Sequence, residues 1–253
     1  MRSVKLTIAF DGSGFAGYEL QPGQRTIRAA IARALKKIYN RSLKFDSSSR
    51  TDASVHAAGL VISYQPPFAI PLNKLPLALN AQLPDDIRVI GARVQGPGFN
   101  ARFDAKSKTY EYLIFNGHIM PPSIRKFAWQ VKPELDLTAM KKAAKYLVGK
   151  HDFASFCAAG GDDDNYVRIL HSLDIGHWKL VIWSGVKYPV IRIKVTGNGF
   201  LYKMVRNIVG TLVEVGLGRR QPGEIKAILQ AKDRRRAGKT APAQGLCLLK
   251  VTY

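Results

Sequence analysis

One short segment combines an acidic and a basic residue in a way that suits nucleophilic chemistry. It reads Ser49-Arg50-Thr51-Asp52-Ala53-Ser54-Val55-His56-Ala57 and lies between two stretches expected to be strands. A guanidinium near a carboxyl favours the ionised carboxylate, so Arg50 is expected to keep Asp52 available as a nucleophile at neutral pH. The same residue types also form ordinary turns, and by chemistry alone a turn is the more common role for Asp52. His56 is likewise more often a packed side chain than a catalyst.

A second candidate is the stretch Lys108-Thr109-Tyr110-Glu111-Tyr112. Tyr110 and Tyr112 are two residues apart, so on a strand they share one face. Aromatic residues on a strand usually belong to a core. In a basic protein they can also be platforms on which bases stack, at about 1–3 kcal/mol per base. The sequence leaves both interpretations open.

Two further segments carry positive charge. In the first, Lys203, Arg206, Asn207 and Gly210 share one face of an expected helix, opposite an apolar stripe of Leu201, Val205, Ile208 and Leu212. That polar face is either solvated or lines a cleft, where it meets a carboxylate. In the second segment, residues 231–246, a basic cluster at 232–236 suits phosphate contacts, with a solvated surface run as the alternative.

The overall charge points to a polyanionic partner. The chain has 39 Lys and Arg against 18 Asp and Glu, which gives a formal net charge of +21 over 253 residues. Basic residues are in excess in both halves, which favours a broad basic surface over a disordered arm. Such a surface attracts nucleic acid and speeds its encounter. A basic protein without a nucleic-acid partner is the alternative on charge alone.

Other features exclude several classes of protein. No apolar run reaches the roughly 20 residues of a membrane span, and the short, Lys-interrupted start of the chain does not read as a signal peptide. Cys157 and Cys247 are far apart, so neither a disulfide framework nor a Cys-rich zinc site is expected. The acidic run Asp162-Asp163-Asp164 is expected to be solvated rather than to bind a metal. The default compartment is the cytoplasm.

Hydrophobic periodicity predicts the elements that position these residues in the first half. Val4, Leu6, Ile8 and Phe10 alternate as in a strand, and Ile27, Ile31 and Leu35 recur as on an amphipathic helix with a basic outer face. The predicted elements are a strand at 3–10, a helix at 26–39, strands at 42–48 and 55–64, a helix at 72–80 and a strand at 87–94. This β-α-β-β-α-β order is that of a ferredoxin-like, or split βαβ, unit.

The second half, from near Ala105, predicts another, more elaborate α+β unit. Its predicted strands are 110–115, 169–183, 188–196 and a closing strand to Tyr253, and its predicted helices are 136–148, 201–215 and 223–231. We expect an α+β protein with an N-terminal half of residues 1–104, carrying the Asp52 loop, and a C-terminal half of residues 105–253. The two halves are expected to share one extended sheet with a basic cleft between them.

Taken together and in this order, the segments resemble the tRNA pseudouridine synthase A family. The resemblance runs from about Leu6 to Tyr253. It rests on Arg50-Thr51-Asp52-Ala53, Val55-His56-Ala57, the strand with Tyr110, Gly149-Lys150-His151-Asp152-Phe153, Met204–Gly210, and Ala231–Arg234 with Gly245-Leu246. It implies the pseudouridine synthase fold: two ferredoxin-like halves joined in one extended, mostly antiparallel sheet with a central basic cleft.

The resemblance also assigns roles to individual residues. Asp52 is the implied nucleophile that isomerises uridine to pseudouridine on a flipped base, and attack on either C6 or C1′ is compatible with the sequence. The implied partners of Asp52 are Arg50, which helps extrude the target nucleotide and hold the site open; Tyr110, which stacks on the base; Arg206, which pairs with Asp52; and Leu246, which packs against the uracil. Lys203 and Arg234 are expected to bind substrate as well.

The implied partner is tRNA, with uridines of the anticodon stem-loop at positions 38, 39 and 40 as targets. The family resemblance further implies a homodimer and a reaction that needs no cofactor or metal. Two alternatives are kept: a catalytically inactive RNA-binding protein of the same fold, and a structural component of a ribonucleoprotein.

Three residues depart from the family pattern. Ser49 and Ser54 stand where the family commonly has Gly, and Ser54 is expected to cost about 1–2 kcal/mol if its φ is positive. Gly17-Tyr18-Glu19 stands where the family usually has Gly-Trp-Gln. Glu19 is an acid at a position where it is expected to repel phosphate.

Overall fold

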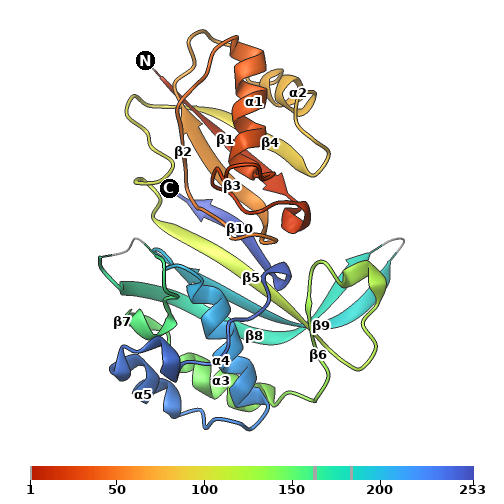
Figure 1. Ribbon diagram of the computed structural model, residues 1–253, viewed down its shortest axis with the longest axis vertical. Helices are drawn as coiled ribbons and strands as arrows, with labels where there is room; N and C mark the ends of the chain where they lie inside the picture. Colours follow the sequence, from red (N-terminus) through yellow and green to blue (C-terminus); the bar gives the residue numbers. More distant parts are fainter. Residues whose placement is uncertain (1, 162–163, 183–184) are drawn as a thin grey trace. The chain divides into compact units, whose positions relative to one another are not determined.

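The computed structural model describes residues 2–161, 164–182 and 185–253 and divides into two compact units (Figure 1). The first unit comprises residues 1–106 together with Cys247–Tyr253, and the second comprises Ser107–Leu246. The acidic run at 162–164 was expected to be solvated, and two of its residues, Asp162 and Asp163, lie outside the described residues.

The first unit contains the predicted β-α-β-β-α-β order. Its elements are β1 (Ser3–Phe10), α1 (Ile27–Tyr39), β2 (Phe45–Ser47), β3 (His56–Tyr64), α2 (Leu75–Asn80) and β4 (Ile87–Gln95). Strand β1 lies between β4 and β3 and pairs with both in antiparallel fashion, and β2 pairs antiparallel with β3. Helices α1 and α2 lie on one face of this sheet (Figure 1). The prediction of a split βαβ unit is confirmed.

Local sequence explains why these elements form. On β1 the alternating residues Val4, Leu6, Ile8 and Phe10 are buried. Helix α1 begins where the Thr26 hydroxyl accepts a hydrogen bond from the Ala29 amide, and ends at Asn40, whose φ is 52°. One face of α1 is buried against the sheet; the buried residues are Ile27, Ala30, Ile31, Ala34, Leu35 and Tyr39.

The last strand of the chain, β10 (Leu246–Thr252), pairs with β3 in parallel. Cys247 lies opposite His56, and the Lys106 amide donates a hydrogen bond to the Thr252 carbonyl, 2.8 Å away. A Cβ on Gly59 would lie 2.4 Å from the Leu249 carbonyl oxygen, so the two backbones meet closely at that point. Cys247–Tyr253 therefore fold with the first unit, whereas the sequence placed all of residues 105–253 in the second half.

The second unit also combines helices with a mostly antiparallel sheet. Its elements are β5 (Ser107–Asn116), β6 (Trp129–Val131), α3 (Leu137–Lys145), β7 (Gly149–Asp152), β8 (Val167–Ile182), β9 (Val186–Gly197), α4 (Met204–Gly216) and α5 (Glu224–Ala231). The strand order is β5-β9-β8-β7 with antiparallel neighbours, and β6 pairs parallel with β5. Helix α3 packs against α4 and β8 (Figure 1). The prediction of an α+β protein with mostly antiparallel strands is confirmed.

Helix α4 is buried on nearly all sides. Besides its apolar stripe, the polar residue Asn207 is fully buried, and so is Gly210. A Cβ on Gly210 would lie 1.7 Å from the Lys239 carbonyl oxygen, so the segment after α5 packs directly on this face of the helix. The interpretation of this face as solvated is wrong for Asn207 and Gly210. Among the described residues, no helix is both long and apolar enough to cross a membrane.

Candidate active site

The segment with Asp52 forms a loop of the first unit between β2 and β3. The Ser48 amide donates to the Val61 carbonyl at 2.9 Å, and the Val61 amide donates to the Ser48 hydroxyl at 3.1 Å. At the other end, the Ser54 amide donates to the Phe15 carbonyl at 3.4 Å. The loop is therefore anchored on both sides of Asp52, whose side chain is half-buried.

Ser54 has a φ of 64°, in the left-handed region. The sequence predicted a cost at this position if φ is positive, and the structure confirms that condition. An L-residue in this conformation loses about 1–2 kcal/mol because its Cβ approaches the neighbouring carbonyl. The chain adopts the backbone that glycine favours, with a serine in its place.

The segment before α1 packs on the Asp52 loop. The Tyr18 amide donates to the Thr51 carbonyl at 2.9 Å, and Tyr18 is fully buried. Gly17 has a φ of 117°, and a Cβ there would lie 3.1 Å from the Thr51 carbonyl oxygen and 3.2 Å from the Ala53 nitrogen. Gly17 thus permits a close approach of the segment before α1 to the backbone of the Asp52 loop.

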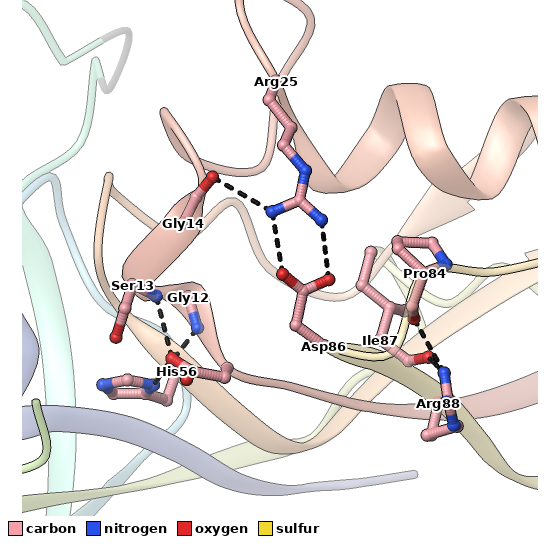
Figure 2. A network of polar contacts seen from close by, with 10 residues as sticks. Gly12, Ser13, Gly14, Arg25, His56, Pro84, Asp86, Ile87 and Arg88 are labelled. Carbon is pink, nitrogen blue, oxygen red and sulfur yellow. Dashed lines mark hydrogen bonds and ion pairs between the residues drawn. The ribbon is translucent and has the colours of Figure 1, made fainter.

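A polar network anchors the turn after β1 to the same loop (Figure 2). The Gly12 amide donates to His56 Nδ1 at 3.1 Å, and a Cβ on Gly12 would overlap the Val55 carbonyl oxygen at 2.0 Å. Figure 2 also shows the Arg25 guanidinium between the Gly14 carbonyl and the Asp86 carboxylate, with Asp86 contacts of 2.7 and 2.8 Å. Since His56 is buried and holds this turn, it is a packed histidine, the more common of the two roles expected from the sequence.

Arg50 makes its ion pair with Glu19. The Nε atom of Arg50 lies 3.1 Å from one oxygen of the Glu19 carboxylate, and the Nε atom of Arg28 lies 3.7 Å from the other. Arg28 is held in addition by the Phe45 carbonyl at 3.2 Å and by the Phe45 ring. From the sequence, Glu19 was expected to repel phosphate; the structure places its carboxylate between two cations.

In the second unit, Tyr110 and Tyr112 lie on β5. Tyr110 is buried to 8% exposure, and its ring meets that of Phe200 edge to face, with centroids 5.1 Å apart. Tyr112 is fully buried and donates from its hydroxyl to the Pro242 carbonyl at 2.7 Å; burial raises the pKa of this phenol. The core interpretation is confirmed for Tyr112, and stacking of a base on Tyr110 stays a prediction.

Arg206 lies in the first turn of α4, and its side chain is oriented by the segment at 237–241. Its Nε donates to the Ala241 carbonyl at 2.8 Å, and the Ala241 amide donates back to the Arg206 carbonyl at 3.1 Å. Lys203 directly precedes the helix with a φ of 55°, and its Nζ lies 4.7 Å from the centre of the Tyr202 ring. The residue after the 3-10 turn at 243–245 is Leu246, which is buried.

The Arg234 side chain contacts protein atoms. Its guanidinium donates to Asn207 Oδ1 at 3.0 Å, to the Thr240 hydroxyl at 3.1 Å and to the Ala237 carbonyl at 3.3 Å. The Asn207 amide group in turn donates to the Phe156 carbonyl at 2.8 Å. The sequence placed Asn207 on the polar face of this helix but did not show that it is the buried centre of a network.

Part of the basic cluster at 232–236 forms ion pairs within the protein. Lys232 lies 3.0 Å from an Asp152 oxygen, and Arg235 lies 2.8 Å from an Asp233 oxygen. Arg236 is exposed. Across the described part of the chain, no group of three His, Cys, Asp or Glu side chains is arranged to hold a metal ion.

The candidate residues are divided between the units. Asp52 and Arg50 are in the first unit, and the second carries the rest: Tyr110, Lys203, Arg206, Arg234 and Leu246. In each unit, packed backbone segments support these side chains. An α+β chain with an anchored Asp-containing loop and a large positive charge fits a class of proteins that act on a polyanion such as RNA.

Comparison with known proteins specifies that class further. Residues 143–253 match the family model described as tRNA pseudouridine synthase. Proteins named tRNA pseudouridine synthase A are similar over the full length: that of Bacillus pumilus (strain SAFR-032) is 44% identical over 99% of this chain and 98% of its own, and that of Moorella thermoacetica (strain ATCC 39073 / JCM 9320) is 43% identical over 100% of both. The protein of that name from Bacillus subtilis (strain 168) is 42% identical over 99% of this chain and 98% of its own. The chain belongs to the tRNA pseudouridine synthase A family.

Proposed function

We propose that this protein isomerises uridine to pseudouridine in tRNA, with Asp52 as the nucleophile. The observation that carries the proposal is the similarity of the whole chain, at 42–44% identity, to proteins named tRNA pseudouridine synthase A. The anchored loop that holds Asp52 supports it, because a nucleophile needs a fixed position relative to the reacting atoms. The protein is thus an isomerase that acts on tRNA.

The reaction exchanges one bond of the ribose for another. The bond from N1 of uracil to C1′ breaks, the base turns, and a bond from C5 to C1′ forms. The hydrogen on C5 leaves as a proton and N1 takes up a proton, so substrate and product have the same composition and charge. Oxidation states and groups balance within the nucleotide, so the proposal includes no cofactor or metal. Asp52 attacks either C6 of the base or C1′ of the ribose, and both routes release the same proton.

The other candidate residues have proposed roles around the flipped base. Extrusion of a nucleotide from a helix costs a few kcal/mol. We assign to Arg50 the task of holding the nucleotide out, and to Tyr110 a stacking contact that returns about 1–3 kcal/mol. We assign Arg206 as the partner of the Asp52 carboxylate and Leu246 as the apolar contact of the uracil. The proposal therefore requires residues of both units to act on one nucleotide.

The anticodon stem-loop is the proposed target, at tRNA positions 38, 39 and 40. The net charge of +21 supports binding to a long phosphate backbone, with Lys203 as a proposed contact. Arg234 is proposed to support the substrate site by ordering the segment at 237–241, because its guanidinium already donates to three protein acceptors. We also propose a homodimer, located in the cytoplasm, where tRNA is modified.

The alternative of an inactive RNA-binding protein was motivated by Ser49, Ser54 and Glu19. Ser54 adopts the left-handed backbone that a glycine would favour, and Glu19 is paired with Arg50 and Arg28. Neither of these two features disrupts the loop, so neither favours loss of catalysis.

The test is release of tritium from tRNA that carries 5-tritiated uridine. We expect release by the wild type and none above background by Asp52→Asn, with tRNA binding retained by both. Asp85→Asn is the matched control, because Asp85 is fully exposed and the substitution changes charge equally. Release by Asp52→Asn at the wild-type rate would remove Asp52 from its role, and the absence of release by the wild type on tightly bound tRNAs would favour the inactive alternative.

A further inference from the structure

The Glu19 carboxylate lies between two arginines at the surface of the first unit. One oxygen is 3.1 Å from Arg50 Nε, and the other is 3.7 Å from Arg28 Nε. The side chains of Glu19 and Arg50 are 41% and 53% exposed. A carboxylate in this position neutralises positive charge at a place that a polyanion can reach.

The backbone holds Glu19 next to the Asp52 loop. Its neighbour Tyr18 is fully buried, donates from its amide to the Thr51 carbonyl at 2.9 Å and accepts from the Arg28 amide at 2.9 Å. Gly17 has a φ of 117° and approaches the same loop closely, since a Cβ there would lie 3.1 Å from the Thr51 carbonyl oxygen. The distance between Glu19 and the loop is therefore set by the fold rather than by a mobile surface segment.

The two arginines differ in how firmly they are held. Arg28 has a hydrogen bond to the Phe45 carbonyl and lies with its guanidinium carbon 4.6 Å from the centre of the Phe45 ring. Its side chain is 27% exposed, about half the value for Arg50. Arg50 is thus the cation that is able to turn from Glu19 to an incoming ligand.

We propose that Glu19 is an affinity-determining residue, a built-in counterion that competes with an RNA phosphodiester for Arg50. Carboxylate and phosphate oxygens accept the same charge-assisted hydrogen bonds from a guanidinium, so one replaces the other. In the RNA-free protein Arg50, which is part of the catalytic loop, pairs with Glu19, and in the complex a phosphate oxygen competes with the carboxylate for the same guanidinium. This inference rests on the proposed function, because it takes Arg50 as a residue that contacts RNA.

The expected effect follows from the exposure of the pair. Exposed ion pairs change an equilibrium constant by about 1.4- to 5-fold, and this competition is removed when the carboxylate becomes an amide. Glu19→Gln is therefore expected to bind tRNA about two- to fivefold more tightly. Since Arg50 then binds phosphate without competition, the dependence of log K on log salt is also expected to steepen, by at most about 0.7–0.9.

The experiment measures tRNA binding by Glu19→Gln, Asp85→Asn and the wild type between about 50 and 200 mM salt. Asp85→Asn has the same change in net charge and in side-chain shape, at a fully exposed site that pairs with Arg88. We expect the tighter binding and the steeper slope for Glu19→Gln alone. Both effects are expected to shrink when Glu19→Gln is made in an Arg50→Ala background, because the guanidinium for which Glu19 and phosphate compete is then absent.

Each other outcome overturns the inference. Identical behaviour of Glu19→Gln and Asp85→Asn would mean that only net charge matters. Weaker binding by Glu19→Gln with a lowered thermal midpoint would mean that the carboxylate is structural, and an undiminished effect in the Arg50→Ala background would mean that it acts elsewhere. Binding is read without turnover, so the proposed function is judged separately: tritium release by the wild type upholds it even if the Glu19 inference fails.

Discussion

Replacement of Ser54 by glycine offers a direct test of the geometry of the catalytic loop. Ser54 has a φ of 64°, where an L-residue loses about 1–2 kcal/mol. Glycine removes that strain but has more freedom to lose on folding, which offsets about 0.5–1 kcal/mol of the gain. The net expectation for Ser54→Gly is a stabilisation of about 0.5–1 kcal/mol, or a rise in thermal midpoint of roughly 1–4 °C for a chain of this size.

Differential scanning calorimetry of the wild type, Ser54→Gly and Ala53→Gly measures this effect. Ala53 is the neighbouring, exposed residue, and it is not among the described residues with a positive φ, so glycine there brings only the entropic loss. We expect the midpoint to rise for Ser54→Gly and to fall for Ala53→Gly, with tritium release maintained in Ser54→Gly. Equal decreases in both variants would refute the argument that Ser54 is strained.

Three further predictions concern the second unit. Arg206→Ala is expected to lower the turnover of bound tRNA more than tRNA affinity, and equal losses in single-turnover and binding assays would remove its assigned role at the nucleophile. Gly210→Ala is expected to lower stability by about 1–3 kcal/mol or more in urea unfolding, because its Cβ would overlap the Lys239 carbonyl; an unchanged midpoint would contradict the packing of α4. Burial would raise the pKa of Glu214, but hydrogen bonds from Arg220 and the Lys239 amide hold the pKa below its usual value of 4.5. The ionised carboxylate therefore stabilises the fold above pH 4.5, and this stabilisation is lost as the pH falls through the lowered pKa. Glu214→Gln is therefore expected to be less stable than the wild type at pH 7 and to approach it in acid, and a difference that is constant with pH would show that the charge is not involved.

Much of the secondary structure is determined by short-range pattern. The alternation of Val4, Leu6, Ile8 and Phe10 predicts β1 as observed, and the apolar spacing from Ile27 predicts α1 within a residue. Two short strands were missed. β6 (Trp129–Val131) and β7 (Gly149–Asp152) have too few residues for a period to be recognised. Both exist because a longer strand lies beside them, and a local pattern does not contain that information.

The polar face of α4 shows a different limit. Periodicity placed Asn207 and Gly210 on one face correctly, and it left open whether that face is solvated. In the structure, the segment at 234–241 covers it, and Arg234 and Thr240 of this segment both donate to Asn207 Oδ1. Which segment covers a helix face depends on the path of the chain roughly 30 residues later.

The sequence by itself determined the family, the two α+β units and the identity of the candidate nucleophile Asp52, because residue types at fixed spacing along a chain are local information. The tertiary structure decided which groups meet. Only the fold placed β10 in parallel beside β3, and only the fold placed Glu19 between Arg28 and Arg50. The physical reason is that ion pairing and strand pairing depend on distance in space, and residues that are dozens of positions apart acquire that distance only when the backbone folds.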